Sequence, residues 1–359
     1  MPRLIRFVLI ALVLAAFFAG LVYNVTWHPA AHEHMPITCN VKDAAPPQLA
    51  PGQTLKVMTW NIQYLAGKRY VFWYDMADGS GPDERPTPED IAYNLDEVVR
   101  VIRDERPDIV LLQEVDDGAK NTDYVNQLAL LQERVTDLLP CSTEAFYWKS
   151  DFIPDPHIFG SVGTKLATLS RFQLDKAERL QLPAAEGSLI GRQFAPKQAL
   201  LVSYLPMTDG KHLAVVNTRL GDFHPGENSI QRQVDFTAKL LDSFERAGTP
   251  WLMGGDFNLL AKGQYQRLAT ELRSEYAPDS ELQTLWDKYS MVPSDKDTNG
   301  EEWRKWLTRF PNDPRVSGPD RTLDYLFYSP QIQRIEARVR QDDTLLISDH
   351  LPVIARFQL

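Results

Sequence analysis

The residues best suited to chemistry lie in the stretch Trp-Leu-Met-Gly-Gly-Asp-Phe-Asn-Leu, residues 251–259. Its three apolar residues are typical of a buried strand, and Gly254 and Gly255 leave room for another group to approach the backbone closely. Asp256 and Asn258 follow, and on an extended chain two residues at this spacing point to the same side. A carboxylate can orient a water molecule, and a carboxamide can donate to an anionic oxygen. The pair suits attack on a phosphate ester, although these residue types also form ordinary turns.

A second candidate follows another predicted buried strand. Residues 109–112 are all apolar, and Gln113 and Glu114 come directly after them. A glutamate at such a position is costly to bury in its ionised form without a partner. The partner would be a divalent cation or an arginine.

Strands and helices must position these side chains. An alternating run predicts a strand that ends at Asn61, and Thr87 with Pro88 predicts the start of a helix that ends near residue 106. Further strands are predicted at residues 163–170, 198–204, 212–218, 322–327 and 353–357, and further helices around residues 128–138 and 230–241. Strands that alternate with helices tend to collect their ends along one rim. The polar residues at these ends are Asn61, Glu114, Arg219, Asp256, Asn258, Asp324, Asp349 and His350.

Together these residues supply the parts of metal-assisted phosphodiester hydrolysis. In order and spacing, their motifs resemble those of the endonuclease/exonuclease/phosphatase superfamily, the deoxyribonuclease I-like hydrolases. The motifs are Thr-Trp-Asn-Ile at 59–62, Leu-Gln-Glu at 112–114, Asn-Thr-Arg-Leu at 217–220, Gly-Asp-Phe-Asn at 255–258, Leu-Asp-Tyr at 323–325 and Ser-Asp-His at 348–350. The resemblance implies an α/β fold: a four-layer α/β/β/α sandwich of two mainly antiparallel sheets, face to face, with helices outside.

The resemblance also implies a metal site. By this likeness Glu114 is the principal Mg²⁺ ligand, Asn61 lies beside it, and Asp349 lies close to the metal. An all-oxygen set of ligands suits Mg²⁺, and Mn²⁺ could substitute for it.

The catalytic roles come from the same resemblance. Asp256 would orient or deprotonate the attacking water, and Asn258 would hold the phosphate. His350 would donate to the phosphate or to the leaving oxygen, with Asp324 fixing its tautomer.

Arg219 departs from the family pattern, because many relatives carry histidine at this position. Arginine cannot exchange a proton at neutral pH, but it can grip a phosphate with two hydrogen bonds. Proton transfer then relies on His350, or activity is reduced. His224 is a candidate substitute, and an ion pair with Asp222 or Glu227 is the structural alternative for Arg219.

The N-terminal segment, residues 1–23, combines Arg3 and Arg6 with a long apolar run. It is predicted to be an uncleaved transmembrane signal-anchor, with a cleavable signal peptide as the alternative. Its basic flank predicts a single-pass protein of the cytoplasmic membrane, with the catalytic domain on the extracytoplasmic (periplasmic) side. Residues 24–53 are rich in proline and are predicted to be a linker, and residues 54–359 are predicted to form the catalytic domain.

Composition and cysteines set further limits. The chain of 359 residues has a formal net charge of −10, which argues against a protein devoted to non-specific binding of duplex DNA. Cys39 and Cys141 are far apart in sequence. They predict either a disulfide between linker and domain or two buried thiols.

The expected function is a membrane-anchored, Mg²⁺-dependent phosphodiesterase or phosphatase. Its substrate would be nucleic acid, a phospholipid head group or a small diester, and the sequence does not choose among them. The expected partners are this substrate and the membrane, and the protein is expected to be a monomer. The alternative is a catalytically weak or inactive family member that serves as a binding or scaffold protein at the membrane.

Overall fold

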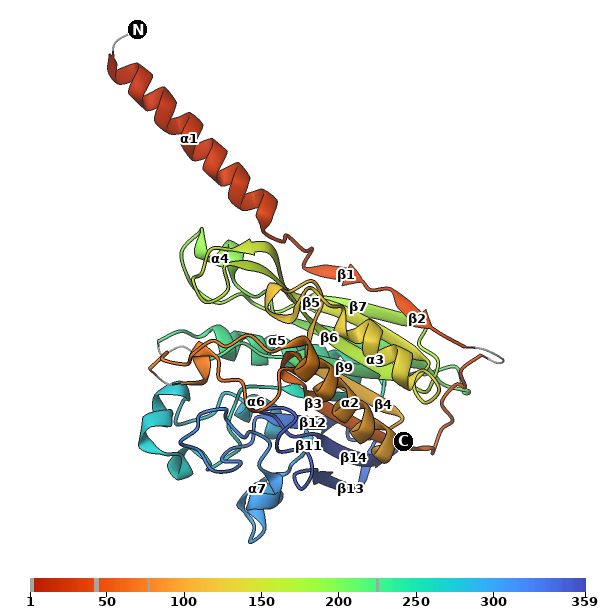
Figure 1. Ribbon diagram of the computed structural model, residues 1–359. Helices are drawn as coiled ribbons and strands as arrows, with labels where there is room; N and C mark the ends of the chain where they lie inside the picture. The colour runs from red at the N-terminus through yellow and green to blue at the C-terminus, as the bar shows by residue number, and fades with distance from the viewer. Residues whose placement is uncertain (1–2, 42–44, 77, 224–225) are drawn as a thin grey trace.

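Two β-sheets packed face to face form the centre of the computed structural model, which describes residues 3–41, 45–76, 78–223 and 226–359 (Figure 1). Among these residues each sheet has seven strands. The first sheet has the spatial order β13 (Gln333–Val339), β14 (Val353–Gln358), β3 (Thr54–Asn61), β4 (Ile109–Asp116), β6 (Gly160–Ser170), β5 (Cys141–Ile153) and β2 (Ile37–Cys39). The second has the order β1 (His32–His34), β7 (Lys176–Gln181), β8 (Ala199–Pro206), β9 (His212–Arg219), β10 (Trp251–Asp256), β12 (Asp324–Tyr328) and β11 (Ser290–Val292).

Each sheet contains one parallel pair, β3 with β4 and β9 with β10, and its other neighbours are antiparallel. The helices are α1 (Arg3–Val25), α2 (Pro88–Glu105), α3 (Gln127–Val135), α4 (Gly191–Phe194), α5 (Ser229–Ala247), α6 (Gln283–Trp286) and α7 (Asp295–Asn299). Short 3-10 helices lie at Gln63–Leu65, Trp73–Asp75, Lys120–Thr122, Tyr265–Arg267, Thr270–Glu275 and Trp303–Trp306.

Three apolar layers hold the sandwich together. On β3, Val57 packs between the sheets, whereas the next residue, Met58, packs outward under α2 and α3. Adjacent residues serve opposite layers because successive side chains of a strand point to opposite faces. On the second sheet, Trp251 of β10 packs outward against α5 and α6. The predicted four-layer α/β/β/α sandwich of mainly antiparallel sheets is therefore confirmed.

The predicted start of α2 is confirmed at the level of single contacts. The Thr87 hydroxyl accepts a hydrogen bond from the Asp90 backbone N–H at 3.2 Å, and Pro88 is the first helical residue. The helix ends at Arg106, whose φ of 47° is left-handed. These caps satisfy backbone groups that a helix end leaves without partners.

The segment predicted to be a linker lies along the domain. Its two short strands, β1 and β2, pair with β7 and β5 at the edges of the two sheets. Cys39 lies opposite Cys141 in the β2–β5 ladder, and the two form a disulfide across a sequence separation of 102 residues. Of the two possibilities for these cysteines, the structure shows the disulfide.

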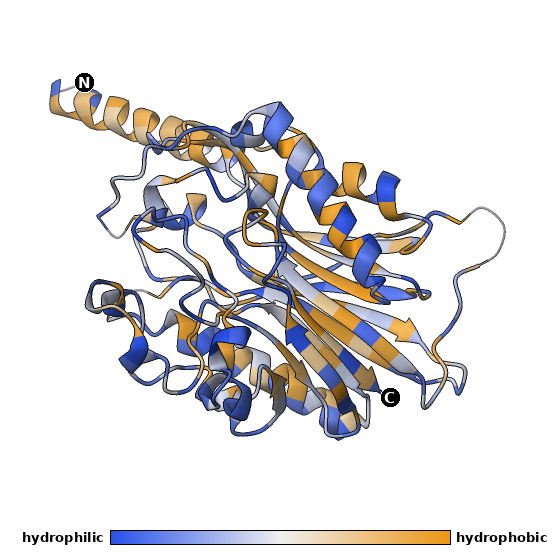
Figure 2. Cartoon of the chain, turned by 60° about the horizontal axis from the view of Figure 1, so that its bottom comes forward, coloured by the Kyte–Doolittle hydropathy of each residue, from blue (hydrophilic) through white to orange (hydrophobic). Residues whose placement is uncertain are grey.

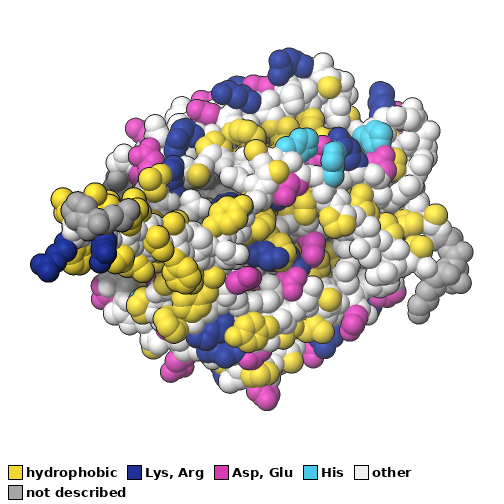
Figure 3. Space-filling model, turned by 90° about the horizontal axis from the view of Figure 1, so that it is seen from above, with side chains coloured by type: hydrophobic (Ala, Val, Ile, Leu, Met, Phe, Trp, Pro, Cys, Tyr) yellow, Lys and Arg dark blue, Asp and Glu magenta, His cyan; other side chains and the backbone are white. Residues whose placement is uncertain are grey.

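Helix α1 projects from the domain. Figure 2 shows it as almost continuously hydrophobic, and Figure 3 looks onto the face of the domain from which it rises. It is long and apolar enough to cross a membrane, a test that a signal sequence near the N-terminus also passes.

Candidate catalytic site

The polar strand ends named above meet at one end of the sandwich. Asn61, at the end of β3, lies opposite Gln113 of β4. Asp256, at the end of β10, lies between Arg219 of β9 and Asp324 of β12. Because the two sheets face each other, this end of the sandwich brings both sets of side chains together. We call it the site end.

Glu114 is turned out of its strand by a β-bulge. The register between β4 and β6 shifts between Leu112 and Val115, and Glu114 has a left-handed φ of 55°. A bulge of this kind redirects a side chain, and a left-handed conformation in a residue other than glycine is strained. The bulge thus aims a buried carboxylate at the site.

One oxygen of Glu114 is engaged and the other is free to bind. Oε1 accepts hydrogen bonds from Asn61 Nδ2 at 2.8 Å and from Arg219 Nε at 3.0 Å. Oε2 accepts no hydrogen bond from any residue that the structure describes. This oxygen is the best-placed donor for a cation.

Asn61 connects the two sheets. Its Nδ2 also donates to Asp256 Oδ2 at 3.1 Å, and its Oδ1 accepts from the Gln63 backbone N–H at 3.0 Å. In this orientation the amide nitrogen faces the carboxylates and the amide oxygen faces the backbone. Asn61 therefore holds Glu114 and Asp256 side by side.

Asp256, Asp324 and His350 form a buried cluster. His350 Nδ1 lies 2.8 Å from Asp324 Oδ2, and His350 Nε2 lies 3.7 Å from Asp256 Oδ2. One ligand atom from each of the three residues lies within 4.8 Å of the other two. The spacing allows a proton relay or a small metal centre.

The protonation states of His350 and Asp256 favour a proton relay over a metal centre. Burial lowers the pKa of His350, but the charges of Asp324 and Asp256 outweigh it and raise this pKa to about 9. Burial also raises the pKa of Asp256 to about 6, against the opposing charge of His350. At neutral pH the imidazole is therefore protonated and the carboxylate is ionised. A protonated histidine cannot ligate a metal, so the oxygen donors around Glu114 fit a divalent cation better.

Asn258 is placed differently from the sequence prediction. Its φ is 53°, so the chain is not extended here, and the expectation that Asp256 and Asn258 share one side through strand alternation is wrong. The Asn258 backbone N–H donates to Asp256 Oδ1 at 3.0 Å, and its Nδ2 donates to the Leu220 carbonyl at 3.0 Å and to Asp222 Oδ1 at 3.3 Å. A turn closed by the Asp256 carboxylate brings the two residues together.

The two glycines before Asp256 allow neighbouring strands to pack closely against β10. A Cβ on Gly254 would lie 2.6 Å from Leu326 Cδ2 and 2.8 Å from Leu111 Cδ1, the latter in the facing sheet. A Cβ on Gly255 would lie 1.9 Å from the Thr218 carbonyl oxygen. The close approach that the sequence predicts is thus made by neighbouring strands.

Arg219 projects into the site, as predicted from its position after Asn217 and Thr218. Besides Glu114, its Nη2 lies 3.4 Å from Asp222 Oδ1, and its Nε lies 3.9 Å from Asp256 Oδ2. The predicted structural alternative, an ion pair with Asp222, is present as well. Within the described part of the chain Glu227 makes no ion pair with Arg219. His224 lies outside the described residues.

Asp349 belongs to a second group of charges, which was not predicted from the sequence. Its Oδ2 pairs with Arg309 Nη1, and Arg309 Nη2 lies 3.8 Å from Asp75 Oδ1. Burial and the charge of Asp349 raise the pKa of Asp75 to about 7, despite Arg309. The Asp349 backbone N–H donates to Gln63 Oε1 at 3.2 Å, which ties this group to the end of β3. The sequence carries no local signal for this group, because Asp75 lies in a short 3-10 helix and Arg309 lies outside the named helices and strands.

Two polar residues of the sequence motifs, Gln113 and Asn217, are hydrogen-bonded to each other between the two sheets, next to the site residues. Gln113 Nε2 donates to Asn217 Oδ1 at 2.8 Å, between the two sheets. Asn217 Nδ2 in turn donates to the Leu112 and Ala167 carbonyls at 3.0 and 2.9 Å. Both residues belong to the sequence motifs, but neither had a predicted role.

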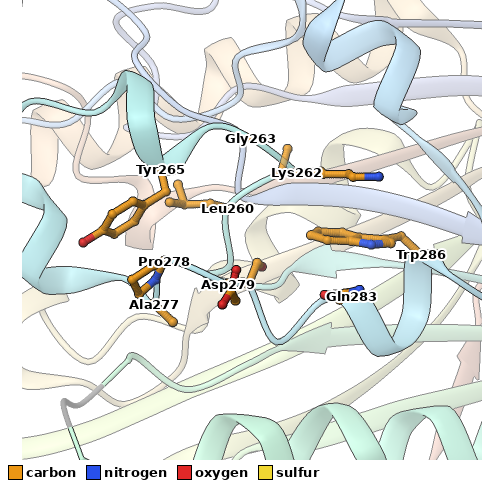
Figure 4. Close-up of a pocket in the computed structure, with 11 residues that line it drawn as sticks. Leu260, Lys262, Gly263, Tyr265, Ala277, Pro278, Asp279, Gln283 and Trp286 are labelled. Carbon is orange, nitrogen blue, oxygen red and sulfur yellow. The ribbon is translucent and has the colours of Figure 1, made fainter.

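A separate small cavity of about 160 Å³ opens beside the loop that follows β10 (Figure 4). Tyr265 and Trp286 flank it, and Asp279 lies between them. None of the site residues described above lines it. This cavity is therefore separate from the candidate site at the strand ends.

Comparisons with known proteins agree with this picture. The model of the Endonuclease/Exonuclease/phosphatase family matches residues 58–350. No curated protein sequence matches the chain.

Solved structures share the fold. An endonuclease/exonuclease/phosphatase from Beutenbergia cavernae DSM 12333 is 21% identical with a TM-score of 0.56, over 86% of this chain and 72% of that chain. The human Nocturnin catalytic domain is 19% identical with a TM-score of 0.52, over 90% of this chain and 96% of that one. Truncated TDP2 from Caenorhabditis elegans is 17% identical with a TM-score of 0.51, over 86% of this chain and 99% of that one. At these identities the likeness concerns the fold alone.

Proposed function

The chain belongs to the endonuclease/exonuclease/phosphatase family, and from this premise we propose that it is a membrane-anchored, Mg²⁺-dependent phosphodiesterase or phosphatase. Family members are generally hydrolases of phosphate esters. The observation that carries the proposal is the convergence of Glu114, Asp256, Arg219 and the His350–Asp324 pair at the site end.

The donor set fits a divalent cation. Glu114 Oε2 is free of hydrogen bonds from described residues, and a second carboxylate, that of Asp256, is held beside it through the amide nitrogen of Asn61. Glu114 would hold Mg²⁺ or Mn²⁺, with Asn61 and Asp349 in support. When bound, the cation would polarise the phosphoryl oxygen and offset negative charge that develops there.

The chain's own residues perform the proton transfers. Asp256, ionised at neutral pH, orients the attacking water and accepts its proton. His350 is protonated at the same pH and donates from Nε2 to the leaving oxygen, while Asp324 holds its Nδ1–H. Asn258 would hold a phosphate oxygen by exchanging the contact of its Nδ2 with Asp222 for one with the phosphate, and Arg219 would stabilise the charge of the transition state.

Anchoring and location are part of the proposal. Residues 1–23 would span the cytoplasmic membrane, residues 24–53 would join the anchor to the domain, and residues 54–359 would form the catalytic domain outside the cytoplasm. The Cys39–Cys141 disulfide supports an oxidising compartment such as the periplasm. The enzyme would act as a monomer.

The test uses the full-length protein in detergent with a soluble aryl phosphodiester, single-stranded DNA and a phospholipid as substrates. We expect turnover with Mg²⁺ that chelation abolishes, and loss of this turnover in Glu114→Gln. The matched control is Glu133→Gln, because Glu133 is an exposed glutamate of α3. The proposal fails if none of the three substrates is turned over in a metal-dependent manner.

One observation favours the second candidate, a binding or scaffold protein without strong catalysis. Arg219 donates to the same Glu114 carboxylate that would hold the cation, and so competes with the metal for it. If the protein is a binding or scaffold protein, Glu114→Gln changes the metal affinity measured by titration calorimetry but leaves the rate of substrate turnover unchanged.

A further inference from the structure

Helix α1 is joined to the site end without a flexible segment between them. Ser150 Oγ of β5 donates to the Val25 carbonyl at 2.7 Å, and Thr26 forms a β-bridge with Ser150. Val22, one turn earlier, is buried against the domain. The first residues after the helix are therefore already part of the folded domain.

The C-terminal end of α1, which we call its root, lies at the same end of the sandwich as the catalytic residues. Ser150 lies opposite Val162 near the start of β6, and two residues later Thr164 lies opposite Asp116, at the end of β4 that carries Glu114. In Figure 1, α1 leans away from the sandwich on the side that also holds α4. The base of the helix and the mouth of the site thus share one end of the domain.

Large apolar side chains are exposed around this root. Phe159 is 60% exposed in the β5–β6 loop, and Leu189 and Ile190 are 76% and 52% exposed just before α4. Trp73 and Tyr74, in the loop before α2, are also exposed. We call these five residues the apolar rim.

Specific contacts hold the rim around the root of α1. Trp148 Nε1 of β5 donates to the Phe194 carbonyl of α4 at 2.8 Å, which keeps the loop with Leu189 and Ile190 next to the strand that binds α1. The ring of Trp73 stacks on His157, with 4.9 Å between centroids, which joins the loop before α2 to the β5–β6 loop. Figure 3 looks onto the end of the molecule that carries the foreshortened helix, where hydrophobic side chains are numerous.

Exposed apolar side chains that cluster on one face mark an interaction surface, whereas single ones are ordinary. Helix α1 has 23 residues, which at about 1.5 Å per residue spans a hydrocarbon core of about 30 Å. With α1 across the bilayer and its last turn fixed to the domain, the rim lies at the level of the lipid head groups. Tryptophan and tyrosine are the residues that favour this level.

We propose that the site end of the domain docks on the bilayer surface beside α1, with the apolar rim inserted among the head groups, and that the substrate is the phosphate ester of a membrane lipid. The inference rests on the proposed hydrolase function and gives it a substrate class. Lipid phosphates lie at the depth that the rim reaches, at the end of the domain where the catalytic residues converge. The net charge of −10 disfavours non-specific association of the whole chain with a nucleic acid.

Docking can be measured without catalysis. The two native cysteines are bonded to each other, so a nitroxide label attaches only to an introduced cysteine. We compare Ile190→Cys with Ile335→Cys in full-length protein reconstituted in vesicles of phosphatidylethanolamine and phosphatidylglycerol. The two isoleucines are 52% and 51% exposed, and Ile335 lies on the edge strand β13, far from α1 in Figure 1.

Docking predicts that the label at position 190 is relaxed more by oxygen than by a water-soluble nickel complex, and that the label at position 335 shows the reverse. Equal aqueous exposure of both labels overturns the docking surface, whether or not the protein is an enzyme.

The substrate class has its own test. Leu189→Ser with Ile190→Ser should lower hydrolysis of vesicle phospholipid about tenfold or more, because burial of each side chain favours the docked state by at least that factor. Hydrolysis of the soluble diester should stay unchanged, and Ile335→Ser should affect neither substrate. Unchanged lipid hydrolysis in the double variant, or hydrolysis of single-stranded DNA in preference to lipid, overturns the proposed substrate class. Absence of metal-dependent turnover of the soluble diester, the single-stranded DNA and the phospholipid alike in the wild type instead overturns the hydrolase function itself.

Discussion

The substitution Asp324→Asn isolates the electrostatic part of the proposed proton transfer. Asp324 Oδ2 lies 2.8 Å from His350 Nδ1 in a buried site, and an asparagine oxygen can still accept that N–H. The ring therefore keeps its orientation while the carboxylate charge is lost. Since this charge is the main cause that raises the pKa of His350 to about 9 against burial, the pKa should fall.

The structure sets the size of the effect. With a pKa of about 9, roughly 90% of His350 is protonated at about pH 8, whereas a histidine at its ordinary value of 6.5 is about 3% protonated there. If the protonated ring is the general acid and its pKa returns to the ordinary value, kcat/KM at about pH 8 should fall about 30-fold in the variant. At about pH 6 both enzymes are mostly protonated, so the difference there should be less than about twofold from this cause.

The assay is kcat/KM for the soluble diester in saturating Mg²⁺ at both pH values. The matched control is Asp342→Asn, an exposed aspartate eight residues before His350, which should leave both values unchanged. If the ratio of the wild-type kcat/KM to that of Asp324→Asn is the same at both pH values, the reasoning is refuted. Asp324 would then act through structure alone.

Three further predictions concern other parts of the chain. Arg219→Ala should lower kcat/KM by about 10²–10³-fold, as for loss of one transition-state donor, and Arg219→His should recover part of it; a change in stability alone would leave the ion pair as the better account. Replacing Cys39 and Cys141 by serine opens a loop of 102 residues and should lower the free energy of unfolding by about 4–5 kcal/mol in denaturant titrations; equal midpoints would contradict this. Gly255→Ala places a Cβ 1.9 Å from the Thr218 carbonyl and should cost about 1–3 kcal/mol or more by the same measurement; a stability equal to that of the wild type would show that the strands separate freely.

Elements with a strong local pattern could be predicted from the sequence. The strand that ends at Asn61, the helix that starts after Thr87 and the strand at Trp251 all occur as expected. Each has an apolar period or a capping residue that acts over a few positions. The order of the motifs, through resemblance to a family, also predicted the sandwich.

Strands that bury polar residues could not be predicted this way. The strand β7 was not predicted, and it buries two charged side chains, Glu178 and Arg179. Arg179 is fully buried, and its Nη1 lies 3.4 Å from Glu33 Oε2 of β1. Ion pairs with residues of other strands offset the free-energy cost of burying such a charge. No local sequence pattern reveals those partners.

The sequence by itself determined which residue types stand at the strand ends, and hence the kind of chemistry that the site can support. Only the tertiary structure decided their contacts: Arg219 reaches Glu114 across a separation of 105 residues, and Arg309 joins Asp75 to Asp349. It also decided that Asn258 leaves the extended conformation and that the segment after α1 is fixed to the domain. These features depend on the register and facing of two sheets, whose strands are distant in sequence, so they arise only when the whole sandwich has formed.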